Sequence, residues 1–367
     1  MAGYDSLAPM PTEPLCKSFE IAVLPGDGIG ADVMAEGLRV LRAVEDTVGG
    51  VNFQVREQAA GATEFLHSGD ALPDTTFEAC RSADATLLGA MGLPQVRYPD
   101  GKELTPQIDL RERLQLYAGL RPTYLYHEAD CPLKGYATGD IDLVLVREST
   151  EGLFSARLSQ GDGHGDEVRD VMRITRAGSE RVCRAAFELA MTRRKKVSLV
   201  DKANVLPSMV FMRQVFDEVA TEFPEVDSEH VYVDAAALFL VRRPEAFDVI
   251  VTENMFGDIL SDLASGLIGG MGMAPSADIG DGAAVFQPAH GTAPDIAGQG
   301  IANPTGMILS VAMMLEWLPG DEVKAGGRQI REAVARTLAD PEKRTPDMGG
   351  SLRTWQMTDT ILAELEQ

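Results

Sequence analysis

Cysteine is scarce in this sequence of 367 residues, and the four that are present stand far apart, at Cys16, Cys80, Cys131 and Cys183. This spacing excludes a Cys-x-x-Cys zinc knuckle and a disulfide framework, and it favours reduced thiols in the cytoplasm. No apolar run approaches the roughly 18 residues of a membrane helix, and the first residues lack the basic and apolar segments of an export signal. A cytoplasmic protein without a membrane partner is therefore expected.

Positive charge is also scarce, with 33 Lys and Arg against 56 Asp and Glu and a net charge of −23. An acidic surface repels phosphate backbones and anionic lipids, so no nucleic-acid partner is predicted. An anionic substrate would need arginines or a metal ion gathered locally. The sequence contains no GxxxxGK(S/T), HExxH or GxSxG motif, which argues against P-loop, zincin and serine-hydrolase chemistry.

The remaining composition is that of a folded chain, with 45% hydrophobic and 24% charged residues. The length corresponds to two domains or one large one. Residues 1–18 contain Pro9, Pro11 and Pro14 and show no apolar periodicity. We therefore expect a flexible N-terminal extension before the first strand.

Short apolar runs alternate with helical patterns along most of the chain. Such alternation predicts an α/β sandwich, with helices covering a mostly parallel sheet. The expected strands are 19–24, 85–90, 141–146, 197–200, 231–233 and 249–252. Two helices are expected over 33–48 and 305–317, and the second of these should be wholly buried. A third helix should carry Val182, Ala186 and Ala190 on its buried face, and a fourth should carry Phe211, Val215, Val219 and Phe223 on one face.

A glycine cluster follows the first predicted strand, with Gly26, Gly28 and Gly30 in the segment PGDGIGAD. Its spacing fits a dinucleotide-binding loop of the Rossmann type. A tight turn from a strand into a helix needs glycines equally. From this segment alone the two interpretations are balanced.

Arginines recur in the middle of the chain, at Arg111, Arg113, Arg121 and Arg147. Arg121 and Arg147 end apolar segments, where a guanidinium is presented to a cleft more readily than to bulk solvent. Converging arginines of this kind would bind a dicarboxylate through paired hydrogen bonds. The sequence alone does not show that they converge.

Three aspartates form a candidate metal site. Asp258 and Asp262 are four residues apart and so share one helix face, where a cation between them would relieve their repulsion. A pair favoured by the helix dipole is the structural alternative. Asp234 ends an apolar strand, an unfavourable place for an unpaired carboxylate, and this favours a hard ion such as Mg²⁺ or Mn²⁺. Lys202, next to Asp201, is either a structural ion pair or a proton-transfer group.

Seven motifs in order resemble the isocitrate/isopropylmalate dehydrogenase family. The resemblance covers nearly all of residues 21–314, and several of the motifs are long. The motifs are PGDGIG, LRxxLxLYxxLRP, VRExTEG, VDKANVL, YVDAxAxxLV, NxFGDILSDLASGL and HGTAPDIAGxGIANP.

The resemblance implies a metal-dependent and NAD- or NADP-dependent enzyme that oxidises a 2-hydroxy acid and then removes its C3 carboxylate as CO₂. It implies a substrate clamp, a Mg²⁺ or Mn²⁺ site shared between two subunits of an obligate homodimer, and a lysine that handles the C2 hydroxyl proton. In this sequence those positions are Arg111, Arg121 and Arg147 for the clamp, Asp258 and Asp262 with Asp234 of the partner subunit for the metal, and Lys202 for the proton.

The resemblance also implies a non-Rossmann cofactor site, so the glycine cluster becomes a strand-to-helix turn near the cofactor. Asp295 resembles the NAD-specific version, in which a carboxylate binds the adenosine ribose and repels a 2′-phosphate. The implied fold has a larger domain, 19–116 with 269–367, and a smaller one, 117–268, with the cleft between them. The implied cofactor residues are Asn204, His290, Gly291, Thr292, Ala293, Asp295, Ile296 and Asn303, the last near the adenine.

Two departures from the family pattern bear on function. Phe154 stands where the family has the tyrosine that protonates the enol carbon, so water or another acid must complete that step. A nucleotide-binding regulatory or catalytically altered paralogue, or oxidation without productive decarboxylation, are the alternatives. The segment 105–108, including Gln107, lacks the serine and asparagine that isocitrate enzymes place there, and Gln107 and Asp109 interrupt the apolar stretch typical of isopropylmalate enzymes. A 3-isopropylmalate-, D-malate- or tartrate-like acid is therefore expected.

Overall fold

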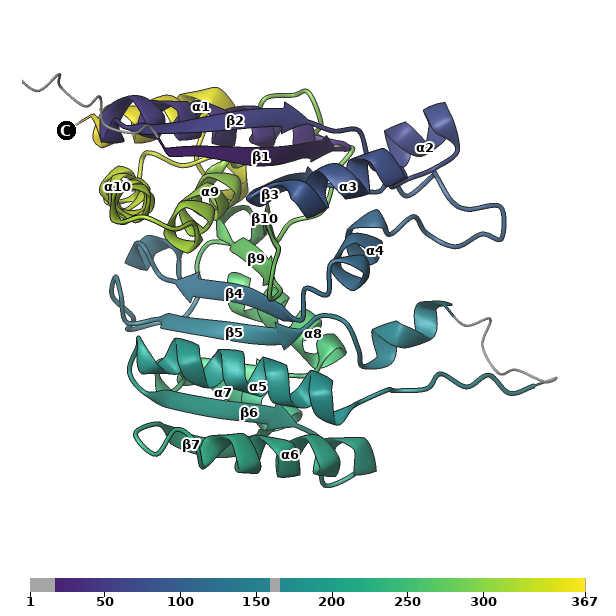
Figure 1. The fold of residues 1–367 in the computed structure, drawn as a ribbon. Coiled ribbons are helices and arrows are strands. Elements are labelled where there is room, and N and C mark those ends of the chain that lie inside the picture. Colours follow the sequence, from purple (N-terminus) through teal and green to yellow (C-terminus); the bar gives the residue numbers. More distant parts are fainter. Residues whose placement is uncertain (1–16, 159–165, 367) are drawn as a thin grey trace, which may run out of the picture.

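The structure is a computed structural model that describes residues 17–158 and 166–366, and helices pack against a single large sheet (Figure 1). The strands are β1 (Lys17–Gly26), β2 (Val51–Glu57), β3 (Ala85–Ala90), β4 (Ala118–Tyr124), β5 (Asp142–Glu148), β6 (Lys196–Asp201), β7 (Asp227–Tyr232), β8 (Val249–Thr252), β9 (Pro275–Ile279) and β10 (Ala284–Pro288). The helices are α1 (Ile29–Val48), α2 (Ala62–Ser68), α3 (Asp74–Ser82), α4 (Pro106–Arg113), α5 (Arg176–Met191), α6 (Pro207–Ala220), α7 (Val233–Leu240), α8 (Asn254–Ser265), α9 (Thr305–Trp317), α10 (Asp321–Leu338) and α11 (Thr354–Leu365), with 3₁₀ turns that include η2 (Leu153–Leu158).

The strand order is β2-β1-β3-β10-β9-β4-β5-β8-β6-β7, and most neighbouring strands are parallel. Antiparallel pairing occurs only around the centre of the described sheet, between β10 and β9, β9 and β4, and β4 and β5. The strands from 19–116 and 269–367 make up one half of the sheet, and those from 117–268 make up the other. The expected α/β architecture is confirmed, and the division into two domains along the same line stays a prediction.

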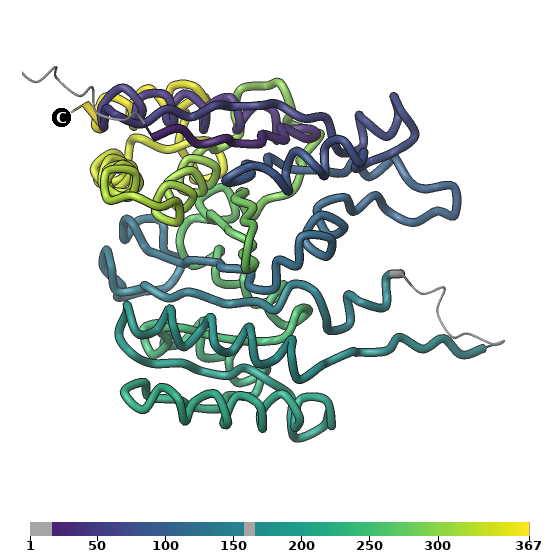
Figure 2. The backbone as a smooth tube through the Cα atoms, viewed as in Figure 1, coloured from purple at the N-terminus to yellow at the C-terminus, as the bar shows by residue number. Residues whose placement is uncertain are grey.

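Both sheet faces are covered, which explains why several strands are apolar throughout. All six residues of β3 are buried, as expected of a strand with helices on both sides. Helix α9 is buried from Thr305 to Leu315 because it is apolar all round and lies between the sheet and α10. Helices α10 and α11 also pack against α1, so the C-terminal segment lies beside the N-terminal strands and helix (Figure 2).

The sequence predicted the strongly apolar elements well. The strands at 85–90 and 249–252 and the helix at 305–317 have the expected bounds. The first strand begins at Lys17, two residues earlier than expected, and residues 1–16 of the predicted extension lie outside the described residues. The predicted strand at 231–233 is wrong at its end, because β7 stops at Tyr232 and Val233 starts a helix.

Two further differences have a physical explanation. The predicted helix face at 211–223 is confirmed for Val215 and Val219, which are buried. It is wrong for Phe211, which lies against the Arg176 guanidinium, and for Phe223, which lies beyond the helix end. Met209, Met212 and Phe216 complete the buried face of α6. Strands β2, β4, β9 and β10 were not predicted. Polar residues alternate with apolar ones in β2, glycine, arginine and proline interrupt β4, and β9 and β10 are short and contain polar residues.

Within the described residues, no helix is long and apolar enough to cross a membrane. Cys80, Cys131 and Cys183 are free thiols, in agreement with the absence of a disulfide framework from these positions. Burial raises the pKa of the Cys80 thiol to about 11. This cysteine is therefore a packing residue rather than a reactive group.

Candidate active site

A cavity of about 280 Å³ lies where β4, β5 and β10 meet helices α4 and α8. Its lining brings together nine residues that the sequence analysis singled out from five separate segments. These are Gln107, Arg111, Arg121, Arg147, Phe154, Asp258, Asp262, His290 and Gly291. The cavity therefore joins the predicted arginine clamp to the predicted carboxylate pair.

Arg147, at the end of β5, connects the arginines to the carboxylates. Its Nε donates to Asn254 Oδ1 at 2.9 Å, and its Nη1 forms an ion pair with Asp258. Helix α8 comes this close because Gly257 has no side chain: a Cβ there would lie 2.7 Å from Arg147 Cγ. Burial, together with the positive charge of Arg111, lowers the pKa of Arg147 to about 10.

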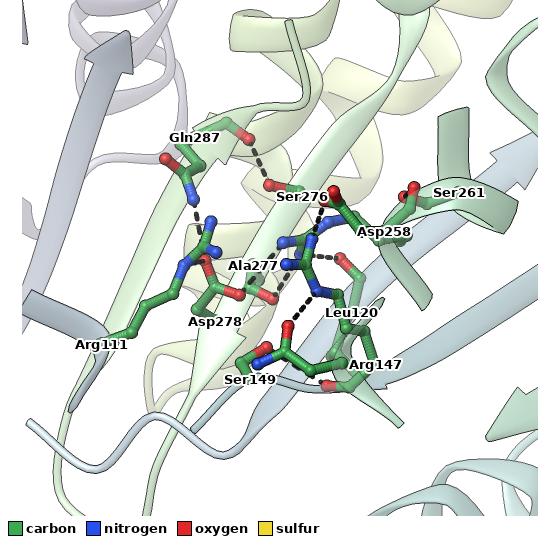
Figure 3. Close-up of polar contacts among 12 residues, drawn as sticks. Arg111, Leu120, Arg147, Ser149, Asp258, Ser261, Ser276, Ala277, Asp278 and Gln287 are labelled. Carbon is green, nitrogen blue, oxygen red and sulfur yellow. Dashed lines mark hydrogen bonds and ion pairs between the residues drawn. The ribbon is translucent and has the colours of Figure 1, made fainter. Parts of the chain in front are cut away.

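Asp278, which was not predicted as a site residue, holds two of the arginines. Its carboxylate is fully buried in β9 and accepts hydrogen bonds from Arg111 Nε at 2.9 Å and Arg121 Nη2 at 3.1 Å. The Gln287 amide donates to the same carboxylate at 2.8 Å, and Figure 3 shows Arg111, Asp278 and Gln287 gathered at one point. Burial favours the neutral acid, but the surrounding arginines hold the pKa of Asp278 below its usual value. An aspartate amid the small residues of PSADIG was the available signal.

Asp258 and Asp262 lie one turn apart on α8, and both line the cavity. Partial loss of hydration and the charge of Asp258 raise the pKa of Asp262. Two carboxylate oxygens held in mutual repulsion are a donor set that fits a hard divalent cation. The described part of one chain contains no cluster of three or more potential metal ligands.

Lys202, Asn204 and Asp234 do not line this cavity. Lys202 follows β6, and its ammonium group contacts the carboxylate of Asp234 in α7. This hydrogen bond lowers the pKa of Asp234. Lys202 therefore pairs with Asp234 rather than Asp201, whose carboxylate binds Arg213 with two hydrogen bonds of 2.8 and 2.7 Å. Asn204 is exposed nearby.

The predicted cofactor residues follow β10 and begin at the edge of the cavity. His290 Nδ1 contacts Gly291 O at 2.9 Å, while its Nε2 is buried without a hydrogen-bond partner. Burial lowers the pKa of His290, so the neutral ring is favoured. Asn303 is buried, with Oδ1 accepting from Thr305 N at 3.0 Å and Nδ2 lying 3.2 Å from Asp347 Oδ2. Ile296 is half-buried, and Asp295 is exposed.

The glycine cluster packs against this same segment. Strand β1 ends at Gly26, helix α1 begins at Ile29, and the Ile29 amide donates to Thr292 O at 2.8 Å. Gly28 has φ of 58°, and a Cβ there would lie 2.1 Å from the same carbonyl oxygen. Ala293, next in the chain, also has positive φ. The cluster is a strand-to-helix turn in which glycine permits close contact.

Comparisons with known proteins agree with this arrangement. Residues 20–361 match the family model described as isocitrate/isopropylmalate dehydrogenase. The chain is 47% identical to the 3-isopropylmalate dehydrogenase of Moorella thermoacetica, over 95% of this chain and 99% of the relative. It is 44% identical to that of Halalkalibacterium halodurans, over 95% and 98%.

Solved structures give the same result. The isocitrate dehydrogenase of Methylococcus capsulatus superposes with a TM-score of 0.86 at 37% identity, covering 95% of this chain and all of that one. A β-decarboxylating dehydrogenase of Thermococcus kodakarensis superposes with a TM-score of 0.79 at 40% identity, covering 95% and 96%. The chain therefore belongs to the isocitrate/isopropylmalate dehydrogenase family, whose members are decarboxylating dehydrogenases.

Proposed function

We propose that this protein catalyses the NAD-dependent and Mg²⁺- or Mn²⁺-dependent oxidative decarboxylation of a 2-hydroxy acid that carries a carboxylate on C3. The observation that carries the proposal is the cavity that brings Arg111, Arg121 and Arg147 next to Asp258 and Asp262. Guanidinium groups bind carboxylates, and the aspartates supply hard oxygen ligands. One cavity thus offers groups for both ends of a hydroxydicarboxylate.

The substrate we favour is 3-isopropylmalate, with D-malate and tartrate as the alternatives. Leu88, Met91, Ile108 and Phe154 supply apolar surface to the cavity, which suits an aliphatic C3 substituent. The curated relatives described above are 3-isopropylmalate dehydrogenases. Gln107 adds one buried amide oxygen without a partner, a feature that a hydroxylated C3 group would satisfy.

In this proposal the arginines bind and orient the substrate carboxylates. Lys202 of the partner subunit takes the C2 hydroxyl proton in its neutral amine form, and its contact with Asp234 holds the side chain in position. When bound, the divalent ion would polarise the C2 oxygen and NAD⁺ would supply the hydride acceptor. After CO₂ leaves, the C3 carbon needs a proton. Phe154, whose ring centroid lies 4.9 Å from Arg147 Cζ, has none to give, so water or another acid provides it.

The cofactor we propose is NAD, bound by the segment from His290 to Ile296 with Asn303 on the adenine side. The exposed carboxylate of Asp295 supports this choice, because it can accept hydrogen bonds from ribose hydroxyls and would repel a 2′-phosphate. Asn204 of the partner subunit would lie beside the cofactor. The larger domain of the proposed two-domain arrangement, 19–116 with 269–367, would then carry most of the cofactor contacts.

A homodimer follows from the proposed chemistry, because Lys202 and Asp234 lie outside the cavity that needs them. Leu238 on α7 and Ile259 on α8 support it, since these large apolar side chains are 54% and 60% exposed on helices that pack against each other. Exposed apolar residues in one area are typical of an association surface. A second copy placed there would bring its Asp234 toward Asp258 and Asp262. We place this dimer in the cytoplasm.

The test is to incubate the purified protein with NAD⁺, Mg²⁺ or Mn²⁺, and 3-isopropylmalate, D-malate, tartrate or isocitrate, while NADH and CO₂ are measured together. Equal amounts of NADH and CO₂ from one acid would establish the reaction and name the substrate. NADH without CO₂ would indicate oxidation alone. NADP⁺ serves as the cofactor control, and preference for it would contradict the role proposed for Asp295.

A regulatory, nucleotide-binding role is the second candidate, favoured by Phe154 alone. It predicts NAD binding without turnover of any of the four acids. The carboxylates that line the cavity weigh against it, because their repulsion is unfavourable in a protein that binds no cation.

A further inference from the structure

The buried carboxylate of Asp278 lies directly behind the arginines of the cavity, in the space left by the missing side chain of Gly119. Asp278 pairs with Gly119 across the β4–β9 ladder, and a Cβ on Gly119 would lie 3.0 Å from Asp278 Oδ1. The flanking residues Ala277 and Ile279 line a separate groove on the opposite face of the sheet. The fold thus places one acidic side chain on the active-site face and leaves room for it.

Asp278 uses part of the hydrogen-bonding capacity of the arginine clamp. It holds Arg111 through Nε and Arg121 through Nη2, while Arg121 Nη1 donates to the carbonyl oxygens of Leu120 at 3.1 Å and Ala277 at 3.2 Å. Among the described residues, no protein acceptor pairs with the Nη atoms of Arg111 or with Arg147 Nη2. Those donors remain for a ligand in the cavity.

The charges in this part of the site can be counted. Arg111, Arg121 and Arg147 contribute three positive charges and Asp278 removes one, which leaves two. Asp258 and Asp262 are reserved for the divalent ion in the proposed function. In the metal-free protein Asp258 also pairs with Arg147. A divalent ion would offset the charges of Asp258 and Asp262 and leave a net of two positive charges. That net charge matches two substrate carboxylates and leaves a third without a counter-charge. Charges this far from bulk water are weakly screened, so one excess charge has a large effect on binding.

We infer that Asp278 is a specificity-determining residue that makes the cavity select dianionic hydroxydicarboxylates over trianionic tricarboxylates. The inference rests on the proposed function, because it concerns the substrate of the same cavity. Asp278 acts through the net charge of the clamp and through the positions of Arg111 and Arg121, without contact with the reacting atoms. Gln287 is the uncharged hydrogen-bond partner of Asp278, because its amide donates to the Asp278 carboxylate in the cavity wall.

Three variants change the charge of this pair in steps with little change in shape. Asp278→Asn raises the net charge of the clamp by one. Gln287→Glu lowers it by as much as one, because two carboxylates in contact can share a proton. The double variant Asp278→Asn with Gln287→Glu restores the original value. The matched control is Asp281→Asn, an exposed position on the same β9–β10 connection, where the carboxylate accepts from the Tyr117 hydroxyl at 2.9 Å.

The measurement is the dissociation constant of 3-isopropylmalate, D-malate and isocitrate by calorimetry on the intact protein with Mg²⁺ and without NAD⁺. The quantity of interest is the ratio of the constant for isocitrate to the constant for each dianion, because a general loss of folded protein cancels in that ratio. We expect the ratio to fall at least about tenfold in Asp278→Asn and to rise at least about tenfold in Gln287→Glu. The double variant should return to within about threefold of the original protein, and Asp281→Asn should not differ from it.

Equal changes for dianions and trianion in both single variants, or a double variant that fails to restore the ratio, would overturn the inference. Gln287→Glu keeps Asp278 in place, so it still decides the matter if Asp278→Asn does not fold. If the original protein turns over a substrate but the ratio of dissociation constants is the same in all variants, the inference about Asp278 is rejected and the proposed function is kept. The expected ratios in a protein that reduces no NAD⁺ would reject the proposed reaction alone.

Discussion

Neutralising either carboxylate of the proposed metal pair should have the same effect on Mg²⁺ binding but opposite effects on the metal-free protein. Asp258 is half-exposed and pairs with Arg147, whose side chain is 4% exposed. Asp258→Asn leaves this buried guanidinium with a weaker partner. Because Arg147 Nε keeps Asn254 and the new amide still offers an oxygen, we expect a loss of only about 1 kcal/mol in the free energy of unfolding.

Among the described residues no cation pairs with Asp262, and partial burial together with the charge of Asp258 raises its pKa, so the fold opposes its ionisation. Asp262→Asn should therefore leave the metal-free protein unchanged or more stable. Mg²⁺ at about one hundred times its dissociation constant should stabilise the original protein by about 2.7 kcal/mol, and neither variant by a comparable amount. Urea unfolding with and without Mg²⁺ measures both effects, and Asp281→Asn is the control for nonspecific binding to an acidic protein. An undiminished Mg²⁺ effect in either variant would refute the assignment of this pair to the metal.

Phe154→Tyr should raise kcat by about tenfold or more if protonation of C3 limits turnover, because a phenol at this position can supply the proton. Stopped-flow measurement of NADH and CO₂ checks this. Unchanged turnover would show that another step is limiting. Ile259→Glu should weaken the dimer at least about 100-fold and abolish turnover, because two-fold symmetry brings two new charges into the interface. Sedimentation equilibrium checks this, with Leu66→Glu, at a 69% exposed site on α2, as the control that should remain dimeric. Burial lowers the pKa of His290, so the original protein should lose stability relative to His290→Gln as pH falls below about 6.5. The difference in free energy of unfolding between the two proteins should change by no more than about 1.4 kcal/mol per pH unit, and it should become constant below the pKa of His290 in the folded protein. Urea unfolding of both proteins between about pH 8 and pH 5 measures this difference, and a difference that does not change with pH would contradict the prediction.

The fold was predictable where burial is uniform. Strands β3 and β8 are buried throughout, and helix α9 is buried from Thr305 to Leu315, so mainly apolar runs in the sequence located them. The centre of the sheet was not predictable in this way, because it carries the site. Strand β4 contains Arg121 and Pro122, and β9 begins with Pro275 and contains Asp278. In these strands the polar residues that shape the cavity interrupt the apolar pattern that would have revealed a strand.

The arginines and carboxylates of the site were found from the sequence, but their convergence was not. Arg111 and Asp278 are 167 residues apart and meet only because β9 returns to pair with β4. The cavity therefore depends on antiparallel pairings that local patterns do not encode. Asp278 itself was missed for the same reason, since an aspartate between alanine and isoleucine gives no sign of its partners until the strand is placed.

The overall acidity of the chain and the positive charge of its cavity are compatible because they act over different distances. Most of the 56 acidic side chains are exposed, and the field of exposed charges is screened within roughly 8 Å at physiological salt. Arg121 and Arg147 are buried, so their field acts on a ligand in the cavity with little screening. The same proximity makes the arginines repel one another, and burial together with the charge of Arg111 lowers the pKa of Arg147. A buried counter-charge at Asp278 relieves this repulsion. It also fixes how many substrate charges the clamp can neutralise, so the stability of the site and its selectivity depend on one side chain.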